Sequence, residues 1–200
     1  MNVAIIQYNA GNVQSVRYAL QRLGIHPILT DDQEQIAKAD KVIFPGVGNA
    51  ASAMEYLKER HLDKLITSLK QPVLGICLGL QLLCKHTEEG DTPCLGIFDT
   101  QVKLFSNKNT FNEVALLKVP QIGWNNIYDC NSVLFNGVID PYVYYVHSYY
   151  AELSGNTIAK TDYTLPYSAA LHKENFYAMQ FHPEKSGVSG HQILSNFLAL

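Results

Sequence analysis

Hydrophobic and polar positions alternate between two spacings over the first 90 residues. Short apolar runs of strand length occur at residues 3–8, 26–30, 41–46 and 72–77. Two longer segments, 13–24 and 51–69, carry apolar residues at the spacing of a helix face. Strands that alternate with helices indicate a parallel sheet covered by helices on both faces. A further helix is predicted at 78–86, directly after the fourth strand.

The pattern changes after Gly90. From Thr92 to Met179 the apolar segments are shorter, rich in Tyr, Val and Phe, and separated by turn sequences, so we predict an antiparallel meander of strands. Residues 190–200 return to helical spacing. The predicted fold is therefore α/β and flavodoxin-like, an open and mostly parallel sheet flanked by helices, with an antiparallel, strand-rich second half. We expect residues 1–200 to form one domain.

Composition and charge exclude several classes of protein. With 47% hydrophobic residues and a formal net charge of -3, the chain has no basic surplus that would favour nucleic acid or an anionic membrane as partner. No signal peptide pattern and no apolar stretch near the roughly 20 residues of a membrane span are present, so we expect a cytoplasmic protein. The four cysteines have neither CxxC nor zinc-ligand spacing, and no metal or cofactor is predicted.

The strongest chemical signal is Cys77 in the sequence Gly-Ile-Cys-Leu-Gly. This is the form of a G-x-S-x-G nucleophile elbow with sulfur in place of oxygen. Glycines at 75 and 79 allow a strand and a helix to approach a sharply turned backbone, and a helix N-terminus favours the thiolate. Taken alone, the stretch fits equally well a buried structural cysteine at a strand-to-helix turn.

A second stretch, Phe-His-Pro-Glu-Lys, places His182 two residues before Glu184. Pro183 favours an extended conformation for His182, and in an extended segment the two side chains point to the same side. A carboxylate beside an imidazole fixes its tautomer and stabilises the imidazolium. A thiol served by such a pair is a nucleophile for acyl transfer, although an HPE sequence is also common in surface turns.

The third stretch is Pro45-Gly46-Val47-Gly48, where a predicted strand ends. Glycine on both sides of Val47 allows its backbone amide to turn into a cavity. Together with the amide of Leu78, it would supply the two donors of an oxyanion hole. Without the other two stretches, a simple strand-ending turn would explain this sequence.

The three stretches, in this order and spacing, resemble the class I glutamine amidotransferases. The resemblance extends over the whole chain and is closer to one family, the HisH glutaminase subunits. The sequences that carry it are Tyr8-Asn9-Ala10-Gly11-Asn12-Val13-Gln14-Ser15-Val16, Gly-Trp-Asn at 123–125, Tyr-Tyr-Val-His-Ser-Tyr at 144–149 and His-Pro-Glu-Lys-Ser at 182–186. The sequence departs from the family pattern at two places, Asn49-Ala50 after the PGVG loop and Gln121 where His is common. These departures concern the geometry of the interface and of the PGVG loop, which we call the oxyanion loop.

The resemblance implies a role for each matching residue. Cys77 is the nucleophile that attacks the glutamine side-chain amide, His182 the general base and acid, and Glu184 its orienting partner. The residues that match glutamine-contacting positions of the family are Gly48, Gln81, Ser148 and Tyr149. By contrast, His147 is expected to be a hydrogen-bonded strand histidine, and Cys84 a core residue on the helix that follows Cys77.

The resemblance also implies a partner. A domain of this size has no room for a synthase that uses the ammonia, so we expect a heterodimer with a HisF-type cyclase subunit that makes imidazole glycerol phosphate. The expected interface residues are Asn12, Trp124 and Lys185. Three alternatives remain at this stage: a paralogue that supplies ammonia for the amidination of surface sugars, a non-catalytic subunit that senses glutamine, and a cysteine peptidase with the same triad.

Overall fold

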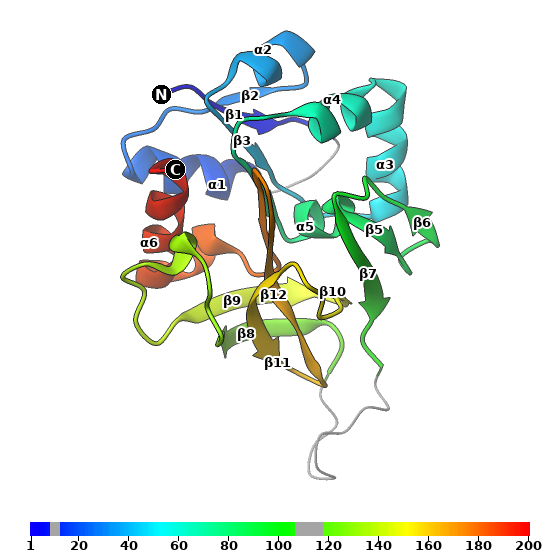
Figure 1. Ribbon diagram of the computed structural model, residues 1–200, viewed down its shortest axis with the longest axis vertical. Coiled ribbons are helices and arrows are strands. Elements are labelled where there is room, and N and C mark those ends of the chain that lie inside the picture. The colour runs from blue at the N-terminus through cyan, green and yellow to red at the C-terminus, as the bar shows by residue number, and fades with distance from the viewer. Residues whose placement is uncertain (9–12, 107–117) are drawn as a thin grey trace.

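The computed structural model describes residues 1–8, 13–106 and 118–200, and its centre is a seven-stranded sheet of order β11-β12-β13-β4-β3-β1-β2 (Figure 1). Five neighbouring strands, from β13 to β2, run parallel, while β11 and β12 extend the sheet by antiparallel pairing. The strands are β1 Val3–Ile6, β2 Ile28–Thr30, β3 Lys41–Phe44, β4 Val73–Ile76, β11 Thr157–Asp162, β12 Pro166–Lys173 and β13 Phe176–Met179. This confirms the predicted mostly parallel α/β sheet.

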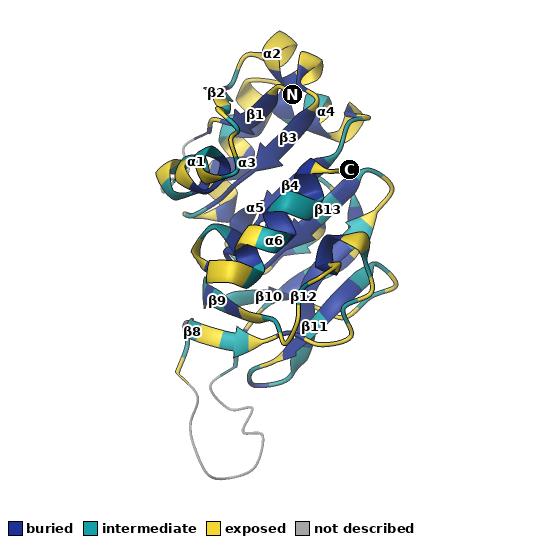
Figure 2. Ribbon diagram, turned by 90° about the vertical axis from the view of Figure 1, so that its left-hand side faces the viewer, coloured by how far each residue is buried: buried dark blue, intermediate teal, exposed yellow. Residues whose placement is uncertain are grey.

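Alternating side chains of the central strands fill two separate cores. Val3 and Ile5 of β1 belong to one hydrophobic cluster, and Ala4 and Ile6 belong to the other, as expected for strands buried on both faces (Figure 2). The first cluster is covered by helices α1 Val13–Arg22 and α6 Gly187–Leu198. The second is covered by α2 Gln33–Lys38, α3 Ala50–Glu59, α4 Leu62–Ser68 and α5 Leu78–Leu83.

The strand-rich second half adds two smaller sheets beside the carboxyl ends of the parallel strands (Figure 1). One is an antiparallel pair, β8 Gln121–Asn126 with β9 Tyr142–His147. The other has the order β10-β7-β5-β6, with β5 Cys84–Thr87, β6 Thr92–Pro93, β7 Phe98–Leu104 and β10 Tyr149–Ala151. Ser148 and Tyr149, two predicted glutamine contacts, and the predicted strand residue His147 lie where β9 ends and β10 begins.

The helix predictions need three corrections. The predicted helix at 51–69 is two helices, because His61 adopts a left-handed conformation with φ 55° between α3 and α4. Helix α2 was not predicted. The helix after Cys77 ends at Leu83 rather than at residue 86, and Cys84 turns extended and begins β5. Strand β5 pairs with the two-residue β6 and, in parallel, with β7, whose Phe98 lies 14 residues after Cys84, so local spacing gave no sign of this strand.

The antiparallel prediction for 92–179 is wrong at two places. Strand β13 pairs in parallel with β4, and β7 pairs in parallel with β5. A meander assumes that strands pair with their neighbours in sequence, whereas β13 inserts beside a strand about 100 residues earlier. This insertion has a functional consequence, because it places the segment after β13 next to Cys77 at the end of β4.

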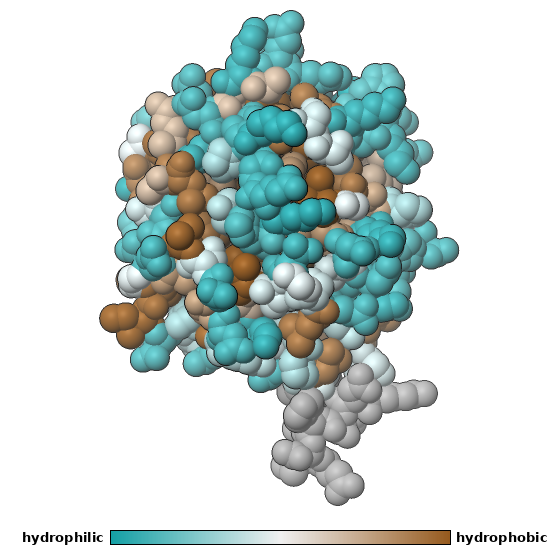
Figure 3. All heavy atoms as spheres, in the orientation of Figure 1, coloured by the Kyte–Doolittle hydropathy of each residue, from teal (hydrophilic) through white to brown (hydrophobic). Residues whose placement is uncertain are grey.

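The surface shows no broad apolar face in the view of Figure 3, where hydrophobic side chains form small groups among hydrophilic ones. Within residues 1–8, 13–106 and 118–200, no helix has both the length and the apolar character needed to cross a membrane.

Candidate active site

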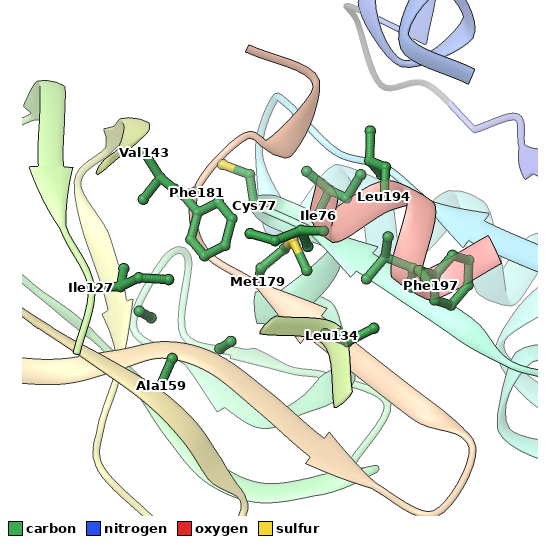
Figure 4. Close-up of a cluster of buried hydrophobic side chains, with 14 of the residues drawn as sticks. Ile76, Cys77, Ile127, Leu134, Val143, Ala159, Met179, Phe181, Leu194 and Phe197 are labelled. Atoms are coloured by element: carbon green, nitrogen blue, oxygen red, sulfur yellow. The ribbon is translucent and has the colours of Figure 1, made fainter. Parts of the chain in front are cut away.

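Cys77 occupies the turn between the end of β4 at Ile76 and the start of α5 at Leu78. Its backbone has φ 54° and ψ −108°, which a residue with a Cβ adopts only under strain. The Cys77 amide donates to the carbonyl of Met179 in β13 at 2.8 Å, so the neighbouring strand fixes the turn. The side chain lies at the edge of the core formed by Ile76, Met179 and Phe181 (Figure 4). A strained elbow of this kind supports a functional cysteine over an ordinary core cysteine.

The flanking glycines are required by close packing. A Cβ on Gly79 would lie 1.9 Å from the carbonyl oxygen of Phe44, and one on Gly75 would lie 2.8 Å from Leu83 Cδ1. A Cβ on Gly46, in the loop after β3, would be 2.6 Å from the Cβ of Leu78. The three glycines therefore let β3, β4 and the first turn of α5 meet around the cysteine, which confirms the predicted close approach of strand and helix.

His182 and Glu184 form a buried pair beside the elbow. Nδ1 of His182 lies 2.7 Å from Oε1 of Glu184, and each side chain is only 2% exposed. The sequence argument for this pairing was wrong in one respect: His182 is extended, but Glu184 lies in a single 3₁₀ turn, η2 Pro183–Lys185. The tight turn, rather than strand alternation, brings the carboxylate back onto the imidazole.

The surroundings of His182 favour the imidazolium. Burial lowers the pKa of His182, but interactions with Cys77 and Glu184, through hydrogen bonding and charge, outweigh it and raise the pKa to about 10. The Nε2 atom makes no complete hydrogen bond to any described residue, although it is close enough to the sulfur for Cys77 to affect the pKa. At neutral pH the ring therefore holds a proton on the side of the cysteine, available to a leaving group.

Glu184→Gln is expected to shift the pH dependence of the reaction. Glu184 raises the pKa of His182, so the amide should lower this pKa and move the loss of kcat/KM at alkaline pH from about pH 10 to a lower pH. The rate itself should fall by roughly 10- to 1,000-fold, less than for loss of the nucleophile. The measurement is kcat/KM for the hydrolysis of glutamine across pH. An unchanged rate and an unchanged alkaline limb in the variant would assign the orienting role to another carboxylate.

A cavity of about 240 Å³ opens beside Cys77. It brings together the nucleophile, both predicted oxyanion donors and all four predicted glutamine contacts, although their roles remain predictions. The lining residues are Val47, Gly48, Cys77, Leu78, Gln81, Glu89, Val146, His147, Ser148 and Tyr149. The site therefore joins the elbow of β4 and α5 to the β9–β10 junction.

Two residues of the site were missed by the sequence interpretation. Glu89 lines the cavity, and its Oε2 accepts a hydrogen bond from the amide of Ala50 at 2.8 Å. Gln180 is fully buried, and its Nε2 lies 3.6 Å from the sulfur of Cys77. Glu89 follows a strand that spacing did not reveal, and Gln180 stands two residues before His182, where only its proximity to the triad could have singled it out.

The PGVG loop is held against the first turn of α5. The amide of Leu78 donates to the carbonyl of Gly46 at 3.3 Å, and the hydroxyl of the buried Tyr8 donates to the carbonyl of Pro45. Val47 is half-buried at the cavity, and Gly48 has φ 131°. In this arrangement the Leu78 amide is engaged by the loop, so the loop must turn before Leu78 and Val47 can both donate to a substrate oxygen.

His147 is a hydrogen-bonded strand histidine and Cys84 a core residue, as predicted. His147 is 6% exposed, with Nδ1 at 2.7 Å from the carbonyl of Tyr149 and Nε2 at 3.1 Å from the hydroxyl of Tyr167. Burial lowers the pKa of His147 to about 3, so the ring is neutral and donates from Nδ1. Cys84 is fully buried in the core, although on a strand and not on the predicted helix.

Two of the three predicted interface residues lie on one surface. Trp124 is 46% exposed on β8 and stacks on Tyr142, with its ring edge-on to Tyr144. The Nζ atom of the exposed Lys185 lies 5.9 Å from the centre of the Tyr144 ring. Asn12, the third predicted interface residue, lies outside the described residues. We call Trp124, Tyr142, Tyr144 and Lys185 the aromatic–lysine surface.

The cysteine elbow on a parallel α/β sheet, with a buried histidine–glutamate pair, defines a cysteine-dependent acyl-transfer enzyme. Residues 4–200 match the family described as glutamine amidotransferase class-I. The chain is 56% identical to the imidazole glycerol phosphate synthase subunit HisH of Bacteroides fragilis and 44% identical to that of Yersinia pseudotuberculosis, with full coverage of both chains in each case. The chain therefore belongs to the class-I glutamine amidotransferase family, and within it to the HisH subunits.

Solved structures agree on the fold. One described as a glutamine amidotransferase has a TM-score of 0.70 at 20% identity, covering 98% of this chain and 97% of its own. A glutamine amidotransferase from Thermotoga maritima has a TM-score of 0.65 at 17% identity, covering 100% of this chain and 81% of its own.

Proposed function

We propose that this protein is the glutaminase subunit of an imidazole glycerol phosphate synthase, which hydrolyses L-glutamine to glutamate and ammonia and passes the ammonia to a HisF-type cyclase subunit. The observation that carries the chemistry is the 2.7 Å contact between His182 and Glu184 beside a strained cysteine that lines a cavity. The pathway rests on full-length similarity to HisH subunits. Because the reaction serves amino-acid biosynthesis, we propose that it takes place in the cytoplasm.

The reaction follows from the protonation state of the site. The thiolate of Cys77 attacks the side-chain carbonyl carbon of glutamine, and a carbon–sulfur bond forms while negative charge moves to the oxygen. His182 gives its Nε2 proton to the amide nitrogen, the carbon–nitrogen bond breaks, and ammonia leaves. Neutral His182 then takes a proton from water, which attacks the thioester and releases glutamate. Glu184 holds the ring by Nδ1 throughout.

The cavity offers complementary groups to free glutamine. Glu89 is a carboxylate at its wall and suits the α-ammonium group, while Gln81 and the backbone at Ser148 and Tyr149 supply polar groups around the rest of the substrate. A peptide substrate would lack the free α-ammonium group that Glu89 recognises. This arrangement favours a glutaminase over a peptidase with the same triad.

The oxyanion loop and the aromatic–lysine surface point to control by the partner. With the Leu78 amide bonded to Gly46, the isolated subunit lacks a complete oxyanion hole and should hydrolyse glutamine slowly. One such donor contributes roughly 100- to 1,000-fold in rate. Val146 lies at the cavity and on the β9 strand that carries Tyr142 and Tyr144, so the proposed docking surface continues to the mouth of the site.

The test of the proposed function is the coupled reaction. The protein and its cyclase partner should convert glutamine to glutamate in step with cyclase product, and the gene should restore growth to a histidine-requiring mutant that lacks this subunit. Ammonia production in step with amidination of a sugar, with no rescue of histidine growth, would assign the chain to the paralogous pathway. No glutaminase turnover with partner and acceptor present would contradict an enzymatic role.

Lys185→Glu should weaken the complex or its stimulation by at least about tenfold, because the change puts a like charge or an unpaired one against the partner. The basal rate of the isolated subunit should stay nearly constant, since Lys185 is exposed and does not line the cavity beside Cys77. The measurement is a titration of partner at saturating glutamine, with and without acceptor. Lys64→Glu makes the same charge change on α4, across the sheet, and should behave as the wild type. Identical titrations for both variants would remove Lys185 from the interface.

A further inference from the structure

A chain of buried amide hydrogen bonds connects the wall of the glutamine cavity to the nucleophile. Nε2 of Gln81 donates to the carbonyl of Tyr149 at 3.0 Å and to Oε1 of Gln180 at 3.1 Å. Nε2 of Gln180 donates to the sulfur of Cys77 at 3.6 Å, which is an ordinary length for a bond to sulfur. Gln180 is fully buried, while Gln81 and Cys77 are 4% and 6% exposed. None of these contacts is used by the triad itself.

The backbone carbonyl of Tyr149 fixes the donor and acceptor of each hydrogen bond in this series. A backbone carbonyl can only accept, so the NH₂ group of Gln81 must face Tyr149. Oε1 of Gln180 must then face the same NH₂ group, and this leaves the NH₂ group of Gln180 directed at the sulfur. The opposite orientation of Gln180 would set two NH₂ groups against each other.

The backbone on both sides of this bond is held by the central sheet. The amide of Gln180 donates to the carbonyl of Ala169 at 2.8 Å, and the amide of Cys77 donates to the carbonyl of Met179 at 2.8 Å. Because donor and sulfur sit on adjoining parts of one sheet, the bond does not depend on the conformation of the PGVG loop.

We propose that Gln180 is a hydrogen-bond donor to the Cys77 thiolate that fixes its direction of attack, and that Gln81 ties this donor to the wall of the glutamine cavity. The inference rests on the proposed glutaminase function. A neutral donor strengthens its hydrogen bond when the acceptor is charged. It therefore favours the thiolate before attack, and it favours the departure of the sulfur when water breaks the thioester. His182 keeps its own proton for the leaving nitrogen.

Several other groups face the sulfur and set its charge environment together with Gln180. Those that interact with Cys77 are His182 after β13, Tyr8 after β1 and Tyr167 of β12. Glu184 acts on His182, and His147 and Glu89 line the same cavity. All of them are unchanged in variants of Gln180, so a difference between such a variant and the wild type reports the amide donor.

The direct test is alkylation of Cys77 by iodoacetamide in the full-length chain, without glutamine or partner. The rate is followed from about pH 5 to about pH 10 on the peptide that contains Cys77, which separates it from the other three cysteines. Gln180→Met removes the donor at similar volume and should move the midpoint of the profile up by about one pH unit. Gln180→Glu keeps the shape but directs a carboxylate oxygen at the sulfur, and should move the midpoint further.

A glutamine variant away from the site serves as the matched control. Gln71→Met removes a partly buried amide that donates to the carbonyl of Ile36 at 3.0 Å, and its alkylation profile should superimpose on that of the wild type. In the complex with the cyclase partner, Gln180→Met should lower kcat for glutamine by roughly 10- to 100-fold and change KM by less than about threefold. Turnover with ammonium salts should stay at the wild-type level, and co-elution with the cyclase partner shows that the variant folds and docks.

Profiles of Gln180→Met and Gln180→Glu that both superimpose on the wild type would overturn the inference. So would a failure of Gln180→Met to co-elute with the cyclase partner together with the loss of glutamine-dependent turnover, since it would show a structural role only. Because alkylation needs no glutamine, the test decides the role of Gln180 even if the protein proves to hydrolyse no glutamine.

Discussion

Cys77→Ala is expected to abolish glutamine-dependent turnover of the complex and to leave ammonium-dependent turnover intact. The sulfur is the atom that forms the thioester, and Cys77 is the one thiol among the described residues that line the cavity. In triad enzymes, loss of the nucleophile costs about 10⁴-fold or more. The measurement is the rate of cyclase product formation with saturating glutamine and, separately, with ammonium salts.

The ammonium reaction controls for the cyclase chemistry, and co-elution of the two subunits controls for folding and docking. Cys77 is 6% exposed and alanine is smaller, so the fold should tolerate the change, and replacing the strained cysteine by another residue with a Cβ neither adds nor relieves the backbone strain. Cys84→Ala is the matched control for Cys77→Ala, because Cys84 is also a buried cysteine and lies six residues beyond Leu78 in the core. This variant should keep glutamine turnover. Equal loss of both reactions in Cys77→Ala would mean that the residue supports the complex and not the chemistry of glutamine.

The local pattern of apolar residues was sufficient to predict the strands of the parallel sheet. It was insufficient to predict strands that form only because a segment distant in sequence pairs with them. Runs such as Val73–Ile76 are apolar on both faces because helices cover both, and this can be seen in sequence alone. Strand β5 is short and half polar, and it exists because Phe98 and its neighbours pair with it. The break at His61 depends on one left-handed residue, which no hydrophobic spacing reveals.

The candidate site divides in the same way. Cys77 and His182 with Glu184 lie in short motifs with strict spacing, and the structure brings the three motifs to one edge of the sheet, as the order of the strands requires. Glu89 and Gln180 carry no motif of their own, because their positions at the site come from the pairing of β5 with β7 and of β13 with β4. The bond between Leu78 and Gly46 depends on the rotation of one peptide, which the sequence Pro-Gly-Val-Gly permits but does not determine.

His182→Asn is expected to lower glutamine turnover by about 10³-fold or more, nearly as much as the loss of Cys77. Asparagine retains a polar group toward Glu184 but cannot give a proton to the leaving nitrogen or take one from water. Cys77 also loses the neighbouring imidazolium, which interactions with Cys77 and Glu184 favour against burial by raising the pKa of His182 to about 10. Turnover with ammonium salts should again stay near the wild-type value.

The double variant and added imidazole distinguish loss of the proton carrier from loss of structure. Because nucleophile and base act in one step, Cys77→Ala with His182→Asn should be no slower than Cys77→Ala alone. Asparagine is smaller than histidine and leaves space at a ring that is 98% buried, so free imidazole should restore part of the activity of His182→Asn and none of that of Cys77→Ala. Activity of His182→Asn within about tenfold of the wild type would contradict the role of His182 as the acid and base, since general acid–base catalysis alone contributes about 10²- to 10⁴-fold.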